Sequence, residues 1–313
     1  MVASTSATVG SVDLLLRGRR RELRGRLFEG LLLLTLLVAL LILATLLFSI
    51  VRQGWPVFAE RGIDFLTSPK STLPQRAGVV QGLLGSLILM GFVAVLAFPL
   101  GIAAAVYLEE YARDTRLNRL IVTNIRNLAG VPAIVFGILG LVIFVDFLRG
   151  FTGPGGGSRG VSYISGGLTL AVLVMPIVII TTMEALRAVP QSIREAAYGV
   201  GATRWEVVRS HVLPYAAPGV LTGTILSLAR AFGETAPLLL VGAVTGFLAT
   251  GSGSLLHTLR GPYTTLPTIV FDWSRSFQQF QQLTAAAIMV LLGTILVVNS
   301  VAIVLRNRYE RKW

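Results

Sequence analysis

The sequence contains 313 residues, of which 54% are hydrophobic and 13% are charged, and its mean hydropathy is +0.75. This composition is too apolar for a soluble globular domain and predicts an integral membrane protein. The formal net charge of +12 does not indicate a nucleic-acid-binding protein, because the basic residues are scattered between apolar segments. The absence of cysteine excludes disulfides and cysteine metal sites, and two histidines far apart in the sequence do not predict a metal centre.

Apolar segments of about 20 residues are long enough to cross a membrane as helices, and the sequence offers six of them. We therefore predict an all-α transmembrane domain over residues 29–306. A basic N-terminal tail over 1–28, expected to be disordered, precedes it, and a short tail over 307–313 follows it. The predicted helices cover about 30–51, 77–108, 127–147, 160–183, 216–244 and 283–305.

The distribution of Lys and Arg predicts the orientation of these helices. If the N-terminus is cytoplasmic, the inner segments hold more than twice as many basic residues as the outer segments. The positive-inside rule then places both termini in the cytoplasm, in agreement with an even number of spans. The predicted location is the cell membrane of a bacterium or archaeon, with multiple passes.

Two of the predicted outer loops invite a closer look. The glycine-rich segment 150–160 lacks the Gly-Lys-Ser/Thr ending and the preceding strand of a phosphate loop, so we interpret it as a flexible turn. The long segment 245–282 is expected to include a helix that lies on the membrane surface or re-enters the membrane.

The fifth predicted helix carries two charged residues inside an otherwise apolar span. Arg230 and Glu234 are four residues apart, which places them on one helical face where they can pair. The pair has two interpretations: a structural ion pair that fixes helix docking, or a contact point for an anionic solute, since guanidinium matches phosphate-like oxygens. A ladder of small residues beside it predicts close packing against another helix: Gly219, Gly223, Ser227, Ala231 and Thr235.

The inner loop 184–214 predicts two short amphipathic helices joined at a glycine corner. Pro190 and Ser192 are typical of a helix start, Gly199 and Gly201 interrupt the helix, and a second short helix follows. Such a protrusion at the inner surface is suited to fit a groove on a soluble partner, although one amphipathic helix alone would be read as an ordinary connector.

This loop resembles the cytoplasmic signature of the ABC importer permeases. The match consists of Glu195-Ala-Ala, Gly201 after three further residues, and Leu213-Pro214, and His211 stands where the signature usually has isoleucine. The resemblance implies that the loop forms the coupling helix that docks on an ATPase subunit. The residues assigned to this coupling role are Glu195, Ala196, Ala197, Gly201, Trp205, Leu213 and Pro214.

Narrower matches resemble the phosphate-specific permeases of the Pst system, the A subunit in particular. They are Tyr107-Leu-Glu-Glu-Tyr111, the segments 127–137 and 185–190, and Ala229-Arg-Ala-Phe-Gly-Glu-Thr-Ala-Pro-Leu238. The resemblance covers about residues 30–306. One departure is Ile180, at a position where relatives can carry an arginine.

The resemblance implies a type I ABC importer permease fold and a chain without a nucleotide site or cofactor of its own. The implied partners are a second, similar permease of the C-subunit type, an ATPase dimer that binds ATP-Mg²⁺, and an extracytoplasmic phosphate-binding protein. The resemblance also implies that Arg230, Glu234 and Thr235 line the pathway of phosphate through the protein, and that membrane lipid surrounds the protein.

The predicted function is that of a permease subunit in ATP-driven phosphate import by alternating access. One alternative is an importer for another oxyanion, such as molybdate or sulfate. A second is an ion-coupled carrier that works through Glu234, although the sequence shows no repeated halves with interrupted helices. A membrane-embedded enzyme has no support, because no nucleophile and base or metal-ligand cluster is evident.

Overall fold

The computed structural model describes residues 6–153, 159–243 and 255–309, which form helices joined by short connections and include no strand. The N-terminal half contains the following helices: α1 (Ser6–Arg61), α2 (Asp64–Thr67), α3 (Val80–Phe92), α4 (Phe98–Val106), α5 (Arg116–Ala129), α6 (Ala133–Gly140) and α7 (Arg149–Thr152). The C-terminal half contains the others: α8 (Tyr163–Arg187), α9 (Gln191–Gly199), α10 (Arg204–Val207), α11 (Leu213–Gly233), α12 (Ala236–Leu240), α13 (Leu255–Leu259), α14 (Leu266–Ser274) and α15 (Gln281–Tyr309).

Several helices join through wider helical turns into longer spans. Among the described residues, five helical stretches are long and apolar enough to cross a membrane, and α5 with α6 forms a sixth if this bent pair is one span. The five continuous stretches cover Gly25–Arg61, Val80–Tyr111, Tyr163–Arg187, Arg204–Gly233 and Gln278–Arg308. The predicted number of spans is therefore reached only when the bent pair is counted.

The chain divides into two compact units, residues 1–52 and residues 53–313. The first unit contains most of α1, whose side chains from Gly25 to Phe48 are all exposed, as expected for a helix in a membrane. The predicted disorder of residues 1–28 is wrong from Ser6 onward, because the helix there is continuous with the span. Leu and Arg are good helix formers, and an existing helix extends at little cost.

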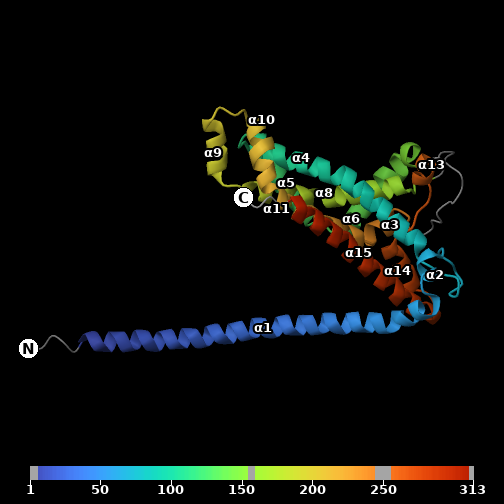
Figure 1. Ribbon diagram of the computed structural model, residues 1–313, viewed down its shortest axis with the longest axis horizontal. Coiled ribbons are helices and arrows are strands. Elements are labelled where there is room, and N and C mark those ends of the chain that lie inside the picture. The colour runs from blue at the N-terminus through green and yellow to red at the C-terminus, as the bar shows by residue number, and fades with distance from the viewer. Residues whose placement is uncertain (1–5, 154–158, 244–254, 310–313) are drawn as a thin grey trace, which may run out of the picture. The chain divides into compact units, whose positions relative to one another are not determined.

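Helix α8 is the centre of the second unit. It contacts α3, α4, α5, α6 and α11, and most of its membrane segment is buried (Figure 1). Small residues bring α11 close: a Cβ at Gly219 would lie 2.8 Å from Ala185, and a Cβ at Gly223 would meet the side chain of Thr181. The close packing expected of the small-residue ladder is confirmed at these two positions.

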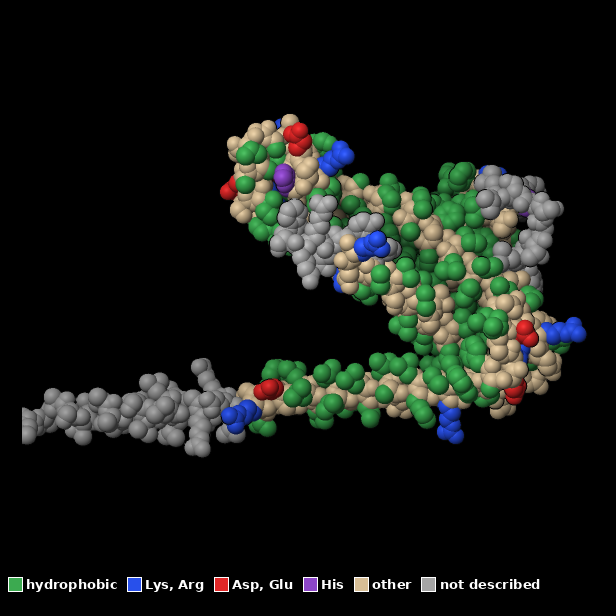
Figure 2. Space-filling view, viewed as in Figure 1, with side chains coloured by type: hydrophobic (Ala, Val, Ile, Leu, Met, Phe, Trp, Pro, Cys, Tyr) green, Lys and Arg blue, Asp and Glu red, His purple; other side chains and the backbone are tan. Residues whose placement is uncertain are grey.

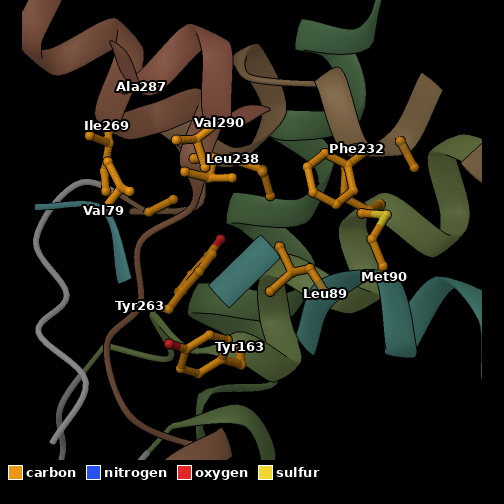
Figure 3. Packing of buried hydrophobic residues seen from close by; sticks show 14 of the residues in the cluster. Val79, Leu89, Met90, Tyr163, Phe232, Leu238, Tyr263, Ile269, Ala287 and Val290 are labelled. Carbon is orange, nitrogen blue, oxygen red and sulfur yellow. The ribbon is translucent and has the colours of Figure 1, made fainter. Parts of the chain in front are cut away.

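A second region of tight packing lies around α14, in the segment predicted to hold an extra helix. Leu266, Ile269 and Trp273 of α14 are buried, and the backbone N–H of Leu266 donates to the Ser86 hydroxyl at 2.9 Å. Figure 3 shows Ile269 beside Val79 and Val290, and Tyr263 facing Tyr163, with 5.3 Å between the two ring centroids. The predicted helix exists and is part of the core, and its position on or re-entering the membrane stays a prediction.

Different helices form the two ends of the second unit. Helices α9 and α10 lie at one end together with the last turns of α15, while α2 and α13 lie at the other (Figure 1). Figure 2 shows acidic, basic and histidine side chains at the α9 and α10 end, further acidic and basic side chains near α2, and many hydrophobic side chains on the helices between the two ends. Which end faces the cytoplasm stays a prediction from the basic residues.

The structure corrects the bounds of several predicted helices. The first continues to Arg61 instead of ending at 51, the second and fourth are displaced by a few residues, and the sixth extends beyond its predicted range at both ends. The third does not begin at 127: α5 ends at Ala129, Pro132 precedes α6, and the two helices meet at 100°. Residues 154–158 of the glycine-rich turn, and 244–254, which include the predicted end of the fifth helix, lie outside the described residues.

Candidate substrate passage and coupling loop

The predicted fifth helix is interrupted at the charged pair. Helix α11 ends at Gly233, Glu234 has an extended backbone (φ −73°, ψ 123°), and α12 begins at Ala236. The prediction of one helix over 216–244 is therefore wrong. Pro237 supplies the reason, because proline has no N–H to donate to the carbonyl of Gly233, four residues earlier, and its ring clashes with that carbonyl in a continuous helix.

The predicted ion pair forms across this break. Arg230 Nε donates to Glu234 Oε1 at 3.3 Å, and the side chains of Arg230 and Glu234 are 49% and 19% exposed. The bond is longer than a strong charge-assisted hydrogen bond. Nη1 and Nη2 of Arg230 make no hydrogen bond within the described part of the chain, so four of the five guanidinium N–H donors have no partner there.

Arg230 lies on a face of α11 that the described residues of the second unit do not cover. Leu226 and Gly233, one turn away on either side, are exposed as well, whereas Ser227 and Ala231 on the other side are buried. A charged side chain in contact with lipid costs about 2.5–3.5 kcal/mol on insertion scales. The exposed face therefore requires a covering protein surface or an aqueous passage.

A second interrupted helix accompanies the first. Helix α6 packs along α12, and each begins next to a proline, Pro132 or Pro237. The approach is close, since a Cβ at Gly137 would lie 2.7 Å from the Cα of Pro237. Thr235, between α11 and α12, is half-buried, and its backbone carbonyl accepts a bond from the Leu239 N–H at 3.0 Å.

The loop at the other end has the predicted plan of two short helices with a glycine corner. Gly201 has a φ of +85°, a left-handed conformation that residues other than glycine adopt at a cost. Thr203 and Glu206 form a reciprocal capping box that begins α10: Glu206 N–H donates to Thr203 Oγ1, and Thr203 N–H donates to Glu206 Oε2.

The residues assigned to coupling divide between surface and core. Glu195, Ala196 and Trp205 are exposed, and Glu195 makes no hydrogen bond or ion pair with the described residues. Ala197 is buried and Leu213 is partly buried, in one small cluster with Leu186, Val189, Val207, Val212, Ala216 and Val220. Pro214 is exposed in the first turn of α11.

Sequence reasoning missed several residues of this loop. Tyr198 and Val200 are 47% and 85% exposed, so the loop that carries the exposed Glu195 presents these two apolar side chains and Trp205 at its surface. An apolar residue beside a predicted helix corner is the signal that could have revealed Val200. His211 lies at the surface, lining a cavity of about 240 Å³ with Ile193, Ser210 and Tyr215.

The two groups of predicted residues are separate. Arg230, Glu234 and Thr235 lie at the far end of α11 from Leu213, and the coupling residues lie at its beginning. Among the described residues, no group of three or more His, Asp or Glu side chains could hold a metal ion.

Comparison with known proteins places this geometry among transport proteins. Residues 97–311 match the family described as binding-protein-dependent transport system inner membrane component. The chain is 34% identical to the phosphate transport system permease protein PstA of Yersinia pestis, with 86% of this chain and 85% of that protein covered. It is 28% identical to the phosphate transport system permease protein PstC of Mesorhizobium japonicum, with 93% and 91% covered.

A solved structure shares the fold. The chain superposes on a chain of a bacterial ABC transporter involved in the import of the acidic polysaccharide alginate, with a TM-score of 0.63 and 15% sequence identity. The superposition covers 94% of this chain and all of the other.

Proposed function

Because the chain belongs to the family of binding-protein-dependent transport system inner membrane components, we propose that it is a permease subunit of an ATP-driven importer of phosphate. The similarity to two kinds of phosphate transport system permease over most of the chain supports the substrate. The observation that carries the proposal is Arg230, a half-exposed guanidinium at a break in a membrane helix with most of its donors unused. The protein is a multi-pass membrane protein.

The uncovered face of α11 is the proposed contact surface for a second permease. A similar subunit facing Leu226 and Arg230 removes them from lipid and leaves the guanidinium at the interface between two chains. Phosphate delivered by an extracytoplasmic binding protein crosses at this interface. The chain with which this one shares the fold comes from another importer, which supports the same architecture.

In this mechanism Arg230 exchanges partners. At rest Glu234 neutralises Arg230 through one long hydrogen bond, whose loss costs little. An arriving phosphate takes up the planar fork of donors, and the glutamate is then released from the guanidinium. The affinity of Arg230 for phosphate is low in this mechanism, because tight binding would prevent release of the ion.

ATP hydrolysis belongs to a partner ATPase that docks on the loop of α9 and α10. Trp205, Tyr198 and Val200 supply apolar contacts, and Glu195 supplies an unpaired carboxylate. Closure of the ATPase then moves the attached helices as rigid bodies and alternates access to the passage.

Substitution of Arg230 by Gln tests the substrate role. We expect uptake of radioactive phosphate by the reconstituted complex to fall about tenfold or more, as one or two charge-assisted hydrogen bonds are lost. Arg275→Gln is the control, since that exposed arginine stacks on Phe271 in the outer segment. Unchanged uptake by the Arg230→Gln protein would remove the arginine from the pathway.

The same assay separates the alternatives. An ion-coupled carrier takes up phosphate without the ATPase and responds to a proton gradient, whereas the proposed importer requires ATP. An importer of another oxyanion takes up sulfate or molybdate in preference to phosphate in direct competition. Either result would contradict phosphate import by an ATP-driven complex.

A further inference from the structure

Three successive residues at the end of the second span each contact an arginine from a different helix. Glu109 pairs with Arg187 in the last turn of α8, with Arg187 Nε donating to both carboxylate oxygens at 2.9 and 3.0 Å. Glu110 pairs with Arg194 of α9 at 2.7 Å.

The third contact is made by Tyr111. The guanidinium carbon of Arg204, in α10, lies 5.1 Å from the centroid of the Tyr111 ring, within the range of a cation–π interaction. The end of the span over Val80–Tyr111 thus touches α8, α9 and α10 within three residues.

The contact between Glu110 and Arg194 is the most enclosed of the three. The side chain of Arg194 is 13% exposed and that of Glu110 is 9% exposed, against 47% and 19% for Arg187 and Glu109. Arg194 also donates from Nη1 to the Val189 carbonyl at 2.8 Å and from Nη2 to the Leu186 carbonyl at 2.9 Å. One guanidinium therefore joins α9, the end of α8 and the end of the second span.

Apolar contacts reinforce the same connection. Ala197, on the buried side of α9, packs in the small cluster that includes Leu186 and Val189, and Ile102 and Val106 of α4 pack against that cluster. Residues 110 and 194 are 84 positions apart in the sequence, so the chain itself does not enforce their contact.

We propose that Glu110 and Arg194 are positioning residues that hold α9 and the span Val80–Tyr111 together as one rigid body. The proposal rests on the coupling role given above to the loop of α9 and α10. Motion that arrives at α9 then passes directly into the second span, in addition to the two spans that flank the loop in sequence. A buried charge pair suits this task, because it fixes one geometry more than it adds stability.

Neutral substitutions distinguish the role of the buried pair from that of the more exposed pair beside it. In the complete complex, reconstituted with its ATPase, second permease and binding protein, we expect Glu110→Gln and Arg194→Gln to lower phosphate uptake per ATP hydrolysed by about fivefold or more. Glu109→Gln is the matched control, one residue away on the same helix end, and loss of its more solvent-accessible pair with Arg187 is expected to change the ratio little. An equal loss in all three variants, or no loss in the first two, overturns the proposal.

A cross-link tests whether the two elements stay together during transport. The chain has no cysteine, so the double variant E110C/R194C introduces a unique pair for a short bismaleimide. We expect the bridged protein to regain uptake per ATP relative to the same variant with each thiol capped singly. Loss of uptake on bridging means that the two helices must separate in the cycle, and it refutes the rigid body.

Hydrogen exchange keeps this inference independent of the transported ion. In the assembled complex, the amides of α9 are expected to exchange faster in Glu110→Gln than in wild type or Glu109→Gln. If the wild-type complex fails to import phosphate, the proposed function fails, but the exchange result still decides whether Glu110 holds α9. Unchanged exchange in Glu110→Gln refutes the positioning role whatever the substrate.

Discussion

Arg230 shows how one side chain can be stable in a membrane without being buried in its own chain. Its half-exposed guanidinium and its single long bond to Glu234 would be unfavourable in lipid, and they become favourable only beside another subunit or water. The sequence predicted the pair from its spacing. It did not predict the extended backbone of Glu234, because spacing alone assumes that the helix continues.

Gly201 is the residue whose backbone conformation is least replaceable in the coupling loop. Its φ of +85° means that Gly201→Ala is expected to destabilise the corner between α9 and α10 by about 1–2 kcal/mol. Hydrogen exchange across residues 191–212 measures this local effect. The number of ATP molecules hydrolysed per phosphate transported is expected to rise in the same variant.

Gly199→Ala is the matched control for that change. Gly199 ends α9 without a positive φ, and a Cβ there has no neighbour within 4 Å. Alanine is a better helix former than glycine, so α9 should exchange no faster in this variant. Equal effects of the two substitutions would show that the corner does not depend on its left-handed residue.

At the scale of helices, the apolar spans were predictable from the sequence, but their interruptions were not predicted. Six stretches of suitable length are present in the sequence. The structure interrupts two of them near Pro132 and Pro237, although both prolines could be read from the sequence. Length and hydropathy average over such a break. The turn at Gly201 was predictable because two glycines in a polar loop are a local signal, whereas the contact of Glu110 with Arg194 depends on packing between distant segments.

The packing of α11 on α8 is expected to be sensitive to a single methyl group. Gly223→Ala places a Cβ against the Thr181 side chain, including its Cβ at 2.6 Å, so the two helices must separate. Overpacking of this kind costs about 1–3 kcal/mol. Thermal unfolding of the purified complex in detergent measures the loss.

Gly293→Ala in α15 serves as the comparison. Gly293 is also in a membrane helix, but a Cβ there has no neighbour within 4 Å. The melting temperature of the complex with Gly293→Ala should stay at the wild-type value or rise slightly. A similar decrease for both variants would mean that the contact at Thr181 is not the cause.

At the scale of the whole molecule, docking and transport are assigned to different regions of one helical frame. The loop of α9 and α10 presents its apolar and acidic side chains at one end, and the interrupted helices α11 and α12 lie further along the same chain (Figure 1). Sequence comparison identified the family because both regions carry recognisable motifs. The frame between them follows from packing around α8.

Trp205 is expected to be a principal contact for the ATPase. Its side chain is 57% exposed at the α9 and α10 end, and tryptophans in interfaces often contribute 2 kcal/mol or more. Trp205→Ala should weaken ATPase binding about thirtyfold, which titration of the purified ATPase onto permease in nanodiscs can measure.

Trp55→Ala provides the control for that measurement. Trp55 is similarly exposed but lines an apolar groove of about 600 Å³ with Phe58 and Met289, away from the coupling loop. The affinity of the Trp55→Ala permease for the ATPase should equal that of the wild-type permease. A matching loss of affinity in both variants would place the docking surface elsewhere or indicate a general defect.

The break at Glu234 and Thr235 also bears on how such permeases diversify. Both residues are partly exposed, and the helix is already interrupted there between α11 and α12. Substitutions there break no continuous helix and remove less buried volume than changes in α8, so they destabilise the fold less. A lineage can therefore acquire a new cargo by altering a few side chains at this junction, while the scaffold and its motor attachment are inherited intact.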